Sequence, residues 1–597
     1  MRVADFIARF VYDELGVKHV FMLTGAGIMH LTDGVASYKK LKTICPHHEQ
    51  TSSMAIDAYS RATENFGVGY FTTGPGSTNA ITGLGGAWQD SVPCLFISGN
   101  VKKSEMSAKS QVKGLRQFGV QEFDIIPVVR SICKYAITLE DPTKVRYEFE
   151  KAVHIAKSGR PGPVWIEIPM DVQSAIIDET ELEGFTSEYD IPKPKEDDIK
   201  EILDLLYKST RPVIISGQGV RISKAIPELE KISKLLEIPI VTPFLGIDTI
   251  RHDSSQYIGK TGVKGDRAAN FTMQNSDLVI AIGTSLHVTV IGYSYDQFAR
   301  NAKKIVIDID KTSHEKKTIK LDKIIESDAK EFLVKLLEKI ENTVQTKFTE
   351  WNKQCIKWKN NYPVCLPEYS KVENGISSYV LVDTLCNLSK ENDIFVSDAG
   401  GTYYATSQAI KLTKPGQRYI PSSAMATMGY SLPAAIGISV ATGNRVLALT
   451  GDGSFQQNIQ ELQTVIQYKL PIKLFVLNNG GYESIRVSQK NYFENRFLGE
   501  GEQSGVSFPD TKKIGEAYGI KTIKITNMDE LNVKLKEVLD YDGAVICEVI
   551  IPEDQEIIPT VASRVNPDGT MSSRPLEDMY PFLDRDEYRS NLYVDEI

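Results

Sequence analysis

Cysteine is scarce in this chain and follows no pattern. The seven cysteines are scattered, odd in number and form no Cys-x-x-Cys pair, and among the eight histidines only His47 and His48 are adjacent. A disulfide framework needs an even, spaced set of cysteines, and a structural zinc site needs clustered cysteine or histidine ligands. The sequence therefore predicts free thiols in a reducing cytoplasm rather than a disulfide scaffold or a zinc centre.

Basic clusters and long apolar runs are also missing. The net charge is −9 and no block of Lys or Arg occurs. This argues against nucleic acid as a main partner, because phosphate binding needs a basic face. The first residues lack the basic and then apolar profile of a secretory signal, and no apolar run is long enough to span a bilayer. We therefore expect neither a nucleic-acid nor a membrane partner.

The chain is rich in short apolar, β-branched segments that alternate with helical patterns. Such alternation is typical of βα units around parallel sheets, in which strands buried on both faces read as continuous apolar runs. At 597 residues the chain exceeds what one core supports. The segments expected as strands are 20–23, 42–45, 68–73, 94–98, 164–168, 212–216, 278–282, 304–309, 394–397, 445–450, 473–477 and 544–549.

Two polar stretches, 186–198 and 342–374, look like linkers. They predict an α/β chain of three domains, each a mostly parallel sheet flanked by helices. The domains are expected at 1–185, 190–340 and 370–550, followed by an acidic, aromatic tail at 552–597.

The strongest motif is Gly451-Asp452-Gly453-Ser454, which follows a predicted strand and precedes a helix expected at 459–468. Asn478-Asn479 follows the next strand, 27 residues beyond Asp452. This spacing places both at the carboxyl ends of parallel strands, where open α/β sheets bind ligands.

The residue types suit a magnesium diphosphate site. Mg²⁺ prefers a few protein oxygens completed by phosphate oxygens and water. The Asp452 carboxylate, the Asn479 amide oxygen and the Gly481 carbonyl supply three, and the N–H groups of Gly453 and Ser454 open a helix that can hold an anion. Each motif alone also reads as an ordinary turn; their combination favours a cofactor site.

With this motif the chain resembles the thiamine diphosphate-dependent decarboxylase and carboligase family, most closely the catalytic subunits of acetolactate (acetohydroxyacid) synthase. The resemblance covers essentially the whole chain. It implies a pyrimidine-binding N-terminal domain, a central nucleotide- or FAD-binding-like domain and a C-terminal diphosphate- and magnesium-binding domain.

The resemblance also assigns catalytic residues. His47-His48-Glu49-Gln50 is similar to the segment that carries the family's essential glutamate, so Glu49 is expected to hydrogen-bond the pyrimidine ring of the cofactor. An apolar pocket would raise its pKa and suit it to proton exchange. Met428, in Met428-Gly429-Tyr430, matches the residue that bends the cofactor, and Gln121 matches a donor at the acceptor site. Without the flanking matches, Glu49 would read as a surface glutamate at a helix start.

Further cofactor contacts follow from the same resemblance. Gly400, Gly401 and Thr402 fit the second diphosphate loop, and Gly25 lies in a glycine-rich loop that faces the thiazolium ring. Tyr482, beside the metal motif, completes the expected cofactor-binding set.

Two departures from acetolactate synthases stand out. Ser488 stands where those enzymes carry a tryptophan in the acceptor pocket, and nearby Glu483, Arg486 and Gln489 suggest a more polar acceptor. In the central domain Ser285 and Thr289 replace two flavin-contacting arginines. That domain therefore binds FAD, binds only a nucleotide, or is an empty scaffold; the three alternatives stay open.

The expected function is a carboligase that decarboxylates pyruvate or a close 2-keto acid and passes the two-carbon unit to a carbonyl acceptor. Pyruvate as acceptor gives acetolactate, and a keto-sugar nucleotide gives a branched sugar. A simple decarboxylase, an oxidase, a cyclic dione hydrolase and a non-catalytic homologue are the alternatives. The resemblance implies a homodimer or homotetramer, because the family's cofactor bridges two subunits. The tail resembles that of carboligases encoded with surface-sugar pathways and is either a docked extension or a lid.

Overall fold

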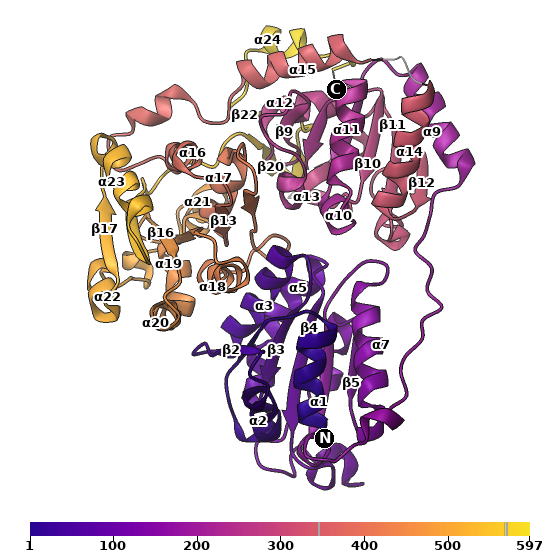
Figure 1. Cartoon of the computed structure of the whole chain (residues 1–597). Helices are drawn as coiled ribbons and strands as arrows, with labels where there is room; N and C mark the ends of the chain where they lie inside the picture. The colour runs from indigo at the N-terminus through magenta and orange to yellow at the C-terminus, as the bar shows by residue number, and fades with distance from the viewer. Residues whose placement is uncertain (344–346, 566, 569–570, 597) are drawn as a thin grey trace.

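The computed structural model describes residues 1–343, 347–565, 567–568 and 571–596. Its three main sheets each contain six parallel strands with helices on both faces. Figure 1 shows the N-terminal domain below, with the central and C-terminal domains side by side above it. The expected α/β fold with three parallel-sheet domains is confirmed.

The N-terminal sheet has the order β2-β1-β3-β4-β6-β5. Its inner strands β3, β4 and β6 are buried at every position, whereas the edge strand β5 is half-buried throughout. The strands are β1 (His19–Met22), β2 (Lys42–Ile44), β3 (Gly67–Phe71), β4 (Cys94–Asn100), β5 (Tyr135–Thr138) and β6 (Val164–Pro169). The helices are α1 (Val3–Arg9), α2 (Met29–Ser37), α3 (Glu49–Thr63), α4 (Pro75–Asn79), α5 (Ile81–Gln89), α6 (Ile126–Val129), α7 (Val145–Lys157) and α8 (Met170–Gln173).

The central sheet has the order β12-β11-β10-β7-β8-β9. Its strands are β7 (Pro212–Ser216), β8 (Ile240–Thr242), β9 (Tyr257–Lys260), β10 (Leu278–Ile282), β11 (Lys303–Asp308) and β12 (Lys323–Glu326). The helices are α9 (Glu196–Lys208), α10 (Gln218–Ile222), α11 (Ile226–Leu236), α12 (Arg267–Gln274), α13 (Val288–Ile291) and α14 (Ala329–Thr343).

The C-terminal sheet has the order β14-β13-β15-β16-β18-β17. Its strands are β13 (Ile394–Ser397), β14 (Arg418–Tyr419), β15 (Val446–Gly451), β16 (Ile472–Asn478), β17 (Lys521–Ile525) and β18 (Val545–Ile550). The helices are α16 (Ser378–Leu388), α17 (Gly400–Ala409), α18 (Ser431–Thr442), α19 (Asp452–Phe455), α20 (Leu462–Gln467), α21 (Glu483–Tyr492), α22 (Thr511–Tyr518) and α23 (Met528–Asp540).

The expected linker at 342–374 contains a helix, α15 (Thr349–Asn361). Residues 344–346 of this stretch lie outside the described residues. Trp351, Cys355 and Trp358 share one face of α15 and are buried in the core of the central domain. This part of the interpretation was wrong, because the apolar face is carried by few residues in an otherwise polar stretch.

The tail is built into the central domain. Leu576, Met579 and Tyr588 belong to the same buried core as the central sheet. The carboxylate of Glu577 is fully buried and accepts hydrogen bonds from Arg300 at 2.6 Å and Gln274 at 2.6 Å. The elements of the tail are β19 (Thr560–Val561), β20 (Ser563–Val565), β21 (Met571–Ser573), β22 (Met579–Tyr580) and α24 (Arg585–Ser590). The part of the tail on which the resemblance to other carboligases rests includes residues 569–570, which lie outside the described residues.

One cluster of charged side chains joins all three domains. Asp248 of the central domain accepts hydrogen bonds from Arg221 at 2.9 Å and from Arg418 of the C-terminal domain at 2.5 Å. Glu64, from the N-terminal domain, pairs with both arginines at 3.0 and 3.6 Å. Burial opposes ionisation of Asp248, but the two guanidinium groups outweigh it and hold its pKa at about 2.

Within the described ranges, no helix is both long and apolar enough to cross a membrane.

Candidate functional site

The proposed metal ligand Asp452 lies at the carboxyl end of β15 and begins α19. One carboxylate oxygen, Oδ2, accepts the backbone N–H groups of Asn479 and Gly481, both at 3.2 Å. The other oxygen accepts the N–H of Gly453 at 2.7 Å. Asp452 therefore draws the loop after β16 against the loop after β15, as the 27-residue spacing predicted.

The side-chain oxygen of Asn479 is buried and has no hydrogen-bond partner among the described residues. An unpaired buried acceptor is costly unless something else, such as a cation, binds it. Burial also raises the pKa of Asp452 to about 6, against the lowering effect of its N–H donors. The Asn479 side-chain oxygen and the Asp452 carboxylate are both groups that a divalent cation would bind.

The described residues contain no group of three His, Cys, Asp or Glu side chains arranged to hold a metal. The loop offers one carboxylate and neutral oxygens, so it is incomplete by itself. Mg²⁺ bound together with a diphosphate needs this kind of partial set, since phosphate oxygens and water fill the remaining positions. The residues present therefore fit a magnesium diphosphate group.

The second diphosphate loop lies beside this motif. Gly400 begins α17 with a φ of 59°. The hydroxyl of Thr402 is 3.6 Å from the Cβ position of Gly451, that is, the place a Cβ would take if this glycine carried one. Buried Asp398 joins the two loops, because its Oδ2 accepts hydrogen bonds from Thr450 at 2.7 Å and Ser454 at 2.6 Å. Gly400, Gly401 and Thr402 thus lie next to the metal motif, at the N-terminus of a helix.

Tyr482 covers the glycine of the metal motif. A Cβ on Gly453 would overlap the Tyr482 ring, which in turn makes an edge contact with Phe508 at 5.8 Å. The Tyr482 N–H donates to the carbonyl of Glu500 at 2.7 Å. Gly453 is therefore required by close packing from the chain itself as well as by its helix-start position.

Met428 lies three residues before the start of α18 and is half-buried. The next residue, Gly429, has a φ of 78° and donates its N–H to the Ser454 hydroxyl at 2.7 Å. The Met428 sulfur is 3.8 Å from the side-chain nitrogen of Gln457. This places Met428 beside the diphosphate motif, and its expected role in bending the cofactor stays a prediction.

Glu49 begins α3 in the N-terminal domain and is 6% exposed. Its Oε2 accepts a hydrogen bond from Asn79 at 3.0 Å, and its Oε1 lies 3.5 Å from the Cβ position of Gly76. A Cβ on either Gly76 or Gly25 would overlap Thr72. Gly25 and Glu49 therefore lie on the same side of the N-terminal sheet, with Thr72 and Gly76 between them.

Gln121 is exposed and has a φ of 60°. Its carbonyl accepts a hydrogen bond from Thr73 at 3.4 Å and lies 2.6 Å from the Cβ position of Gly74. Gly74 immediately precedes α4, the helix that carries Asn79. Gln121 is thus brought to the carboxyl end of β3, on the side where Glu49 lies.

Asn458, which the sequence analysis missed, connects the N-terminal and C-terminal domains within the chain. Its side chain bonds Thr51 at 3.1 Å, the Gly429 carbonyl at 2.8 Å and Gln50 at 3.4 Å. It is therefore a shared partner of the residues next to Glu49 and Met428. The expected helix at 459–468 instead begins as 3₁₀ at Gln456–Glu461 and is kinked at Asn458, where φ is −136°. The kink turns Asn458 toward the N-terminal domain.

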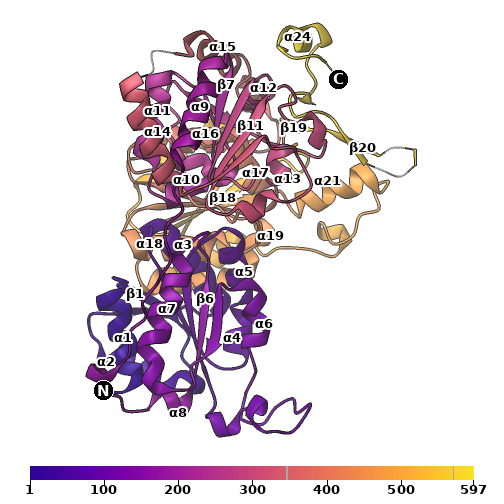
Figure 2. The same cartoon turned by 90° about the vertical axis from the view of Figure 1, so that its right-hand side faces the viewer.

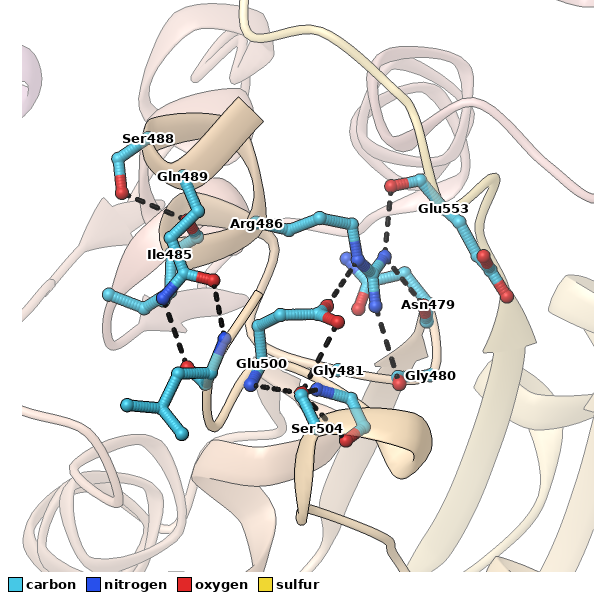
Figure 3. A network of polar contacts seen from close by, with 12 residues as sticks. Asn479, Gly480, Gly481, Ile485, Arg486, Ser488, Gln489, Glu500, Ser504 and Glu553 are labelled. Carbon is cyan, nitrogen blue, oxygen red and sulfur yellow. Dashed lines mark hydrogen bonds and ion pairs between the residues drawn. The ribbon is translucent and has the colours of Figure 1, made fainter. Parts of the chain in front are cut away.

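The polar residues expected at the acceptor pocket have separate hydrogen-bond partners. Figure 3 shows Arg486 bonded to the metal loop and to Glu500, and Gln489 bonded to the backbone of Leu498. The Ser488 hydroxyl donates to its own helix at the Ile485 carbonyl. Arg486 and Gln489 are thus both bonded within the protein, and their expected part in a polar acceptor pocket stays a prediction.

Glu483 differs from these residues. Its carboxylate occupies the space where a Cβ on Gly401 would lie, at the start of α17. Burial raises its pKa to about 7, although Lys264 of the central domain and Arg486 act in the opposite direction. Glu483 therefore lies at the diphosphate loop, within electrostatic reach of Lys264.

The central domain gives no independent sign of a dinucleotide. Gly217 and Gly219, at the end of β7, would each overlap Gly283 if they carried a Cβ. Their small size is therefore explained by contact with the chain itself. Lys316 donates to the carbonyl of Ser285, one of the two positions where the family has arginine.

Three family models match the chain in order along its length. They describe the N-terminal TPP binding domain, the central domain and the C-terminal TPP binding domain of thiamine pyrophosphate enzymes, TPP being thiamine diphosphate. They match residues 1–126, 199–336 and 398–549. The two TPP binding models cover the domains that carry Glu49 and Asp452.

Curated relatives are similar over nearly the whole chain. The acetolactate synthase large subunit of Cyanidium caldarium is 31% identical, over 92% of each chain. That of Porphyra purpurea is 32% identical, over 92% of this chain and 91% of its own. That of Buchnera aphidicola subsp. Acyrthosiphon pisum (strain APS) is 32% identical, over 93% and 96%. The chain therefore belongs to the family of thiamine diphosphate-dependent enzymes and is close within it to the acetolactate synthase large subunits.

Proposed function

We propose that this enzyme decarboxylates pyruvate, or a close 2-keto acid, and transfers the two-carbon unit to a carbonyl acceptor. The observation that carries the proposal is the Asp452–Asn479 pair, whose unpaired buried oxygen lies beside the glycine-rich start of α17. The relatives named acetolactate synthase support the same reaction class. Thiamine diphosphate, when bound, supplies the electron sink that allows a 2-keto acid to lose CO₂.

The C-terminal domain would hold the charged end of the cofactor. Asp452, Asn479 and Gly481 would supply oxygens to Mg²⁺. The N–H groups from Gly400 to Thr402 at the start of α17, and that of Ser454 in α19, would bind the diphosphate. Gly453, expected in the same set, would let the backbone approach the phosphate, because its N–H already donates to Asp452. The Ser454 hydroxyl is already bonded to Asp398, so its backbone N–H is the group left for the ligand.

Glu49 would hold and move a proton at the pyrimidine ring. Asn79 binds Oε2 of Glu49, which leaves Oε1 as the oxygen that faces the ring nitrogen. Burial at the start of α3 keeps bulk water from competing for that proton. Met428 precedes Gly429, whose N–H donates to Ser454, and would support the cofactor and fix its bend.

The working unit is proposed to be a homodimer or a dimer of dimers. The loop at 112–123 exposes five large apolar side chains, a number that suits burial against a second copy. They are Val112, Leu115, Phe118, Val120 and Phe123. Sedimentation at assay concentration tests this, and an active monomer would contradict it.

All seven cysteines are free, which supports our assignment to the cytoplasm.

The acceptor is proposed to be more polar than a second pyruvate. The Glu483 carboxylate lies at the diphosphate loop, and Lys264 acts on it electrostatically. The Lys264 ammonium group donates to the Ile557 carbonyl at 3.3 Å and lies 5.8 Å from the Tyr404 ring. A pair of opposite charges offers both acceptors and donors to a hydroxylated or anionic substrate. A keto-sugar nucleotide has both kinds of group.

FAD in the central domain remains a proposal based on the resemblance alone. A yellow protein with flavin absorbance after purification would support it, and a colourless but fully active protein would exclude a required flavin. No step of the proposed reaction depends on it.

An NMR time course with pyruvate, thiamine diphosphate and Mg²⁺ tests the main proposal. Acetolactate formed at a useful rate identifies donor and acceptor together and argues against the polar acceptor. Slow acetaldehyde release points to a missing acceptor, and a keto-sugar nucleotide is then added. If no 2-keto acid is consumed under any of these conditions, the proposed function is wrong.

A further inference from the structure

We propose that Arg486 is a positioning residue for the metal loop, which it holds in its metal-binding shape from outside the site. This rests on the proposed function, because it assumes that the loop at 479–481 binds Mg²⁺. Arg486 lies one turn into α21, directly after that loop. The sequence suggested that Arg486 contributes to a polar acceptor pocket; its contacts in the structure point to a role in the metal loop.

The Arg486 guanidinium binds backbone carbonyls in two separate segments (Figure 3). Its Nη1 donates to the carbonyls of Asn479 at 3.3 Å and Glu553 at 3.1 Å, and its Nη2 donates to that of Gly480 at 3.4 Å. Two successive peptides of the metal loop are thereby fixed to one rigid planar group. The contact with Glu553 fixes the start of the tail to the same group.

Gly481 is enclosed between the two sides of this arrangement. Its N–H donates to Asp452 on the metal side. A Cβ on its other side would overlap the Arg486 guanidinium and the Glu500 carbonyl. Gly481, whose carbonyl is proposed to bind the metal, is therefore enclosed between Asp452 and Arg486, and a shift of either changes the direction of that carbonyl.

Glu500 balances the charge and completes the support. Its carboxylate accepts the Nε of Arg486 at 2.6 Å, and both side chains are less than 20% exposed. Its backbone N–H donates to Ser504 at 2.9 Å, and its carbonyl accepts the N–H of Tyr482. A neutralised guanidinium does not repel a nearby cation as a free one would. Arg486 can therefore order the loop without weakening the metal site.

The test measures metal dependence without turnover. Thiamine diphosphate binding is followed by calorimetry at a series of Mg²⁺ concentrations, which gives the concentration for half-saturation. Since loss of groups that orient metal ligands typically weakens metal affinity about 10- to 100-fold, Arg486→Met should raise this concentration by that factor. Arg486→Lys keeps the charge but loses the planar fork, so an increase smaller than that of Arg486→Met is expected.

Arg496→Met is the matched control. Arg496 pairs with Glu494 at 2.7 Å, but the two side chains are 67% and 85% exposed, and the pair lies outside the metal loop. Half-saturation should change less than about 2-fold, since exposed ion pairs contribute little. The same variants are melted in EDTA, where a purely structural defect appears without metal.

The outcomes separate the two claims. A rise for Arg486→Met, a smaller one for Arg486→Lys and none for Arg496→Met supports the positioning role. An unchanged half-saturation in a folded Arg486→Met variant overturns it, even if its melting temperature in EDTA falls. If Arg486→Met does not fold, the Arg486→Lys value decides by the same criterion. A wild-type protein that binds no thiamine diphosphate at any Mg²⁺ concentration overturns the proposed function as well.

Discussion

The carboxylate of Asp452 accepts the backbone N–H of Asn479 at 3.2 Å, although 27 residues separate them in the chain. The contact orients the Asn479 backbone while the Asn479 side-chain oxygen remains buried and unpaired. A loop held by its backbone with a free side-chain acceptor is prepared for a ligand before the ligand arrives. Metal and cofactor affinity should therefore be more sensitive than stability to changes at this pair.

Asn479→Ala should raise the Mg²⁺ concentration needed for thiamine diphosphate binding by at least about 10-fold, because one metal oxygen is lost. Thermal stability in EDTA should be unchanged or higher, since an unpaired buried acceptor is removed. Asn387→Ala, on the exposed face of α16, is the control. Equal loss of stability in both metal-free and metal-bound protein would argue for a structural role only.

Glu49→Gln should reduce turnover by at least about 100-fold while thiamine diphosphate affinity changes little, because glutamine cannot hold and return the proton. Asn79→Ala should cause a smaller loss, since it frees Oε2 without removing the acid. Steady-state kinetics and calorimetry on the same preparations measure both quantities. Full activity in Glu49→Gln would disprove the proposed proton role.

Glu167 is buried in β6 and accepts hydrogen bonds from Asn100 at 2.9 Å and Thr138 at 2.8 Å. Burial raises its pKa to about 8, against these donors. The folded protein holds the Glu167 proton more tightly than the unfolded chain does, so protonation stabilises the fold. This stabilisation is fully present below the unfolded pKa, near 4.5, and is lost as pH rises toward 8. Relative to wild type, the isosteric Glu167→Gln should gain up to about 1.4 kcal/mol per pH unit across that window. Urea unfolding of both proteins at pH 5.5, 7 and 8.5 tests this, and a constant difference would contradict it.

Asp248→Asn should lower the free energy of unfolding by about 3–5 kcal/mol, because it leaves the guanidinium groups of Arg221 and Arg418 without their buried carboxylate. Asp253→Asn is the control, since its pair with Arg251 is nearly half exposed. Differential scanning calorimetry should show the Asp248 variant melting earlier and with a broader or divided transition. A shift no larger than that of Asp253→Asn would mean that the cluster contributes little to the contact between domains.

Much of the fold could be read from the sequence, because buried parallel strands leave a direct trace. All twelve expected strand segments coincide with strands of the three sheets to within two residues. Edge strands leave a weaker trace. In β12 (Lys323–Glu326) only one residue is buried, and β14 has two residues, so neither forms an apolar run.

The same distinction applies to the site. Asp452 and Asn479 belong to a spaced motif that follows two strands, and the structure joins them. Asn458 and Arg486 are recognised only from partners that are remote in the chain, such as Thr51 and Glu553. Asn458 directly precedes the helix expected at 459–468 and was not singled out, and Arg486 was interpreted as part of a polar acceptor pocket.

The packing of the tail has a consequence for synthesis on the ribosome. The core of the central domain includes Leu576, Met579 and Tyr588, which are made only after the whole C-terminal domain. At a typical 5–20 residues per second, roughly 10 to 50 s pass between the emergence of α14 and that of the tail. During this time the surface that receives the buried tail stays open, and the entire C-terminal domain is made. The last-synthesised residues thus complete a domain that was begun far earlier, and a nascent chain that stops before them keeps an apolar surface exposed to chaperones.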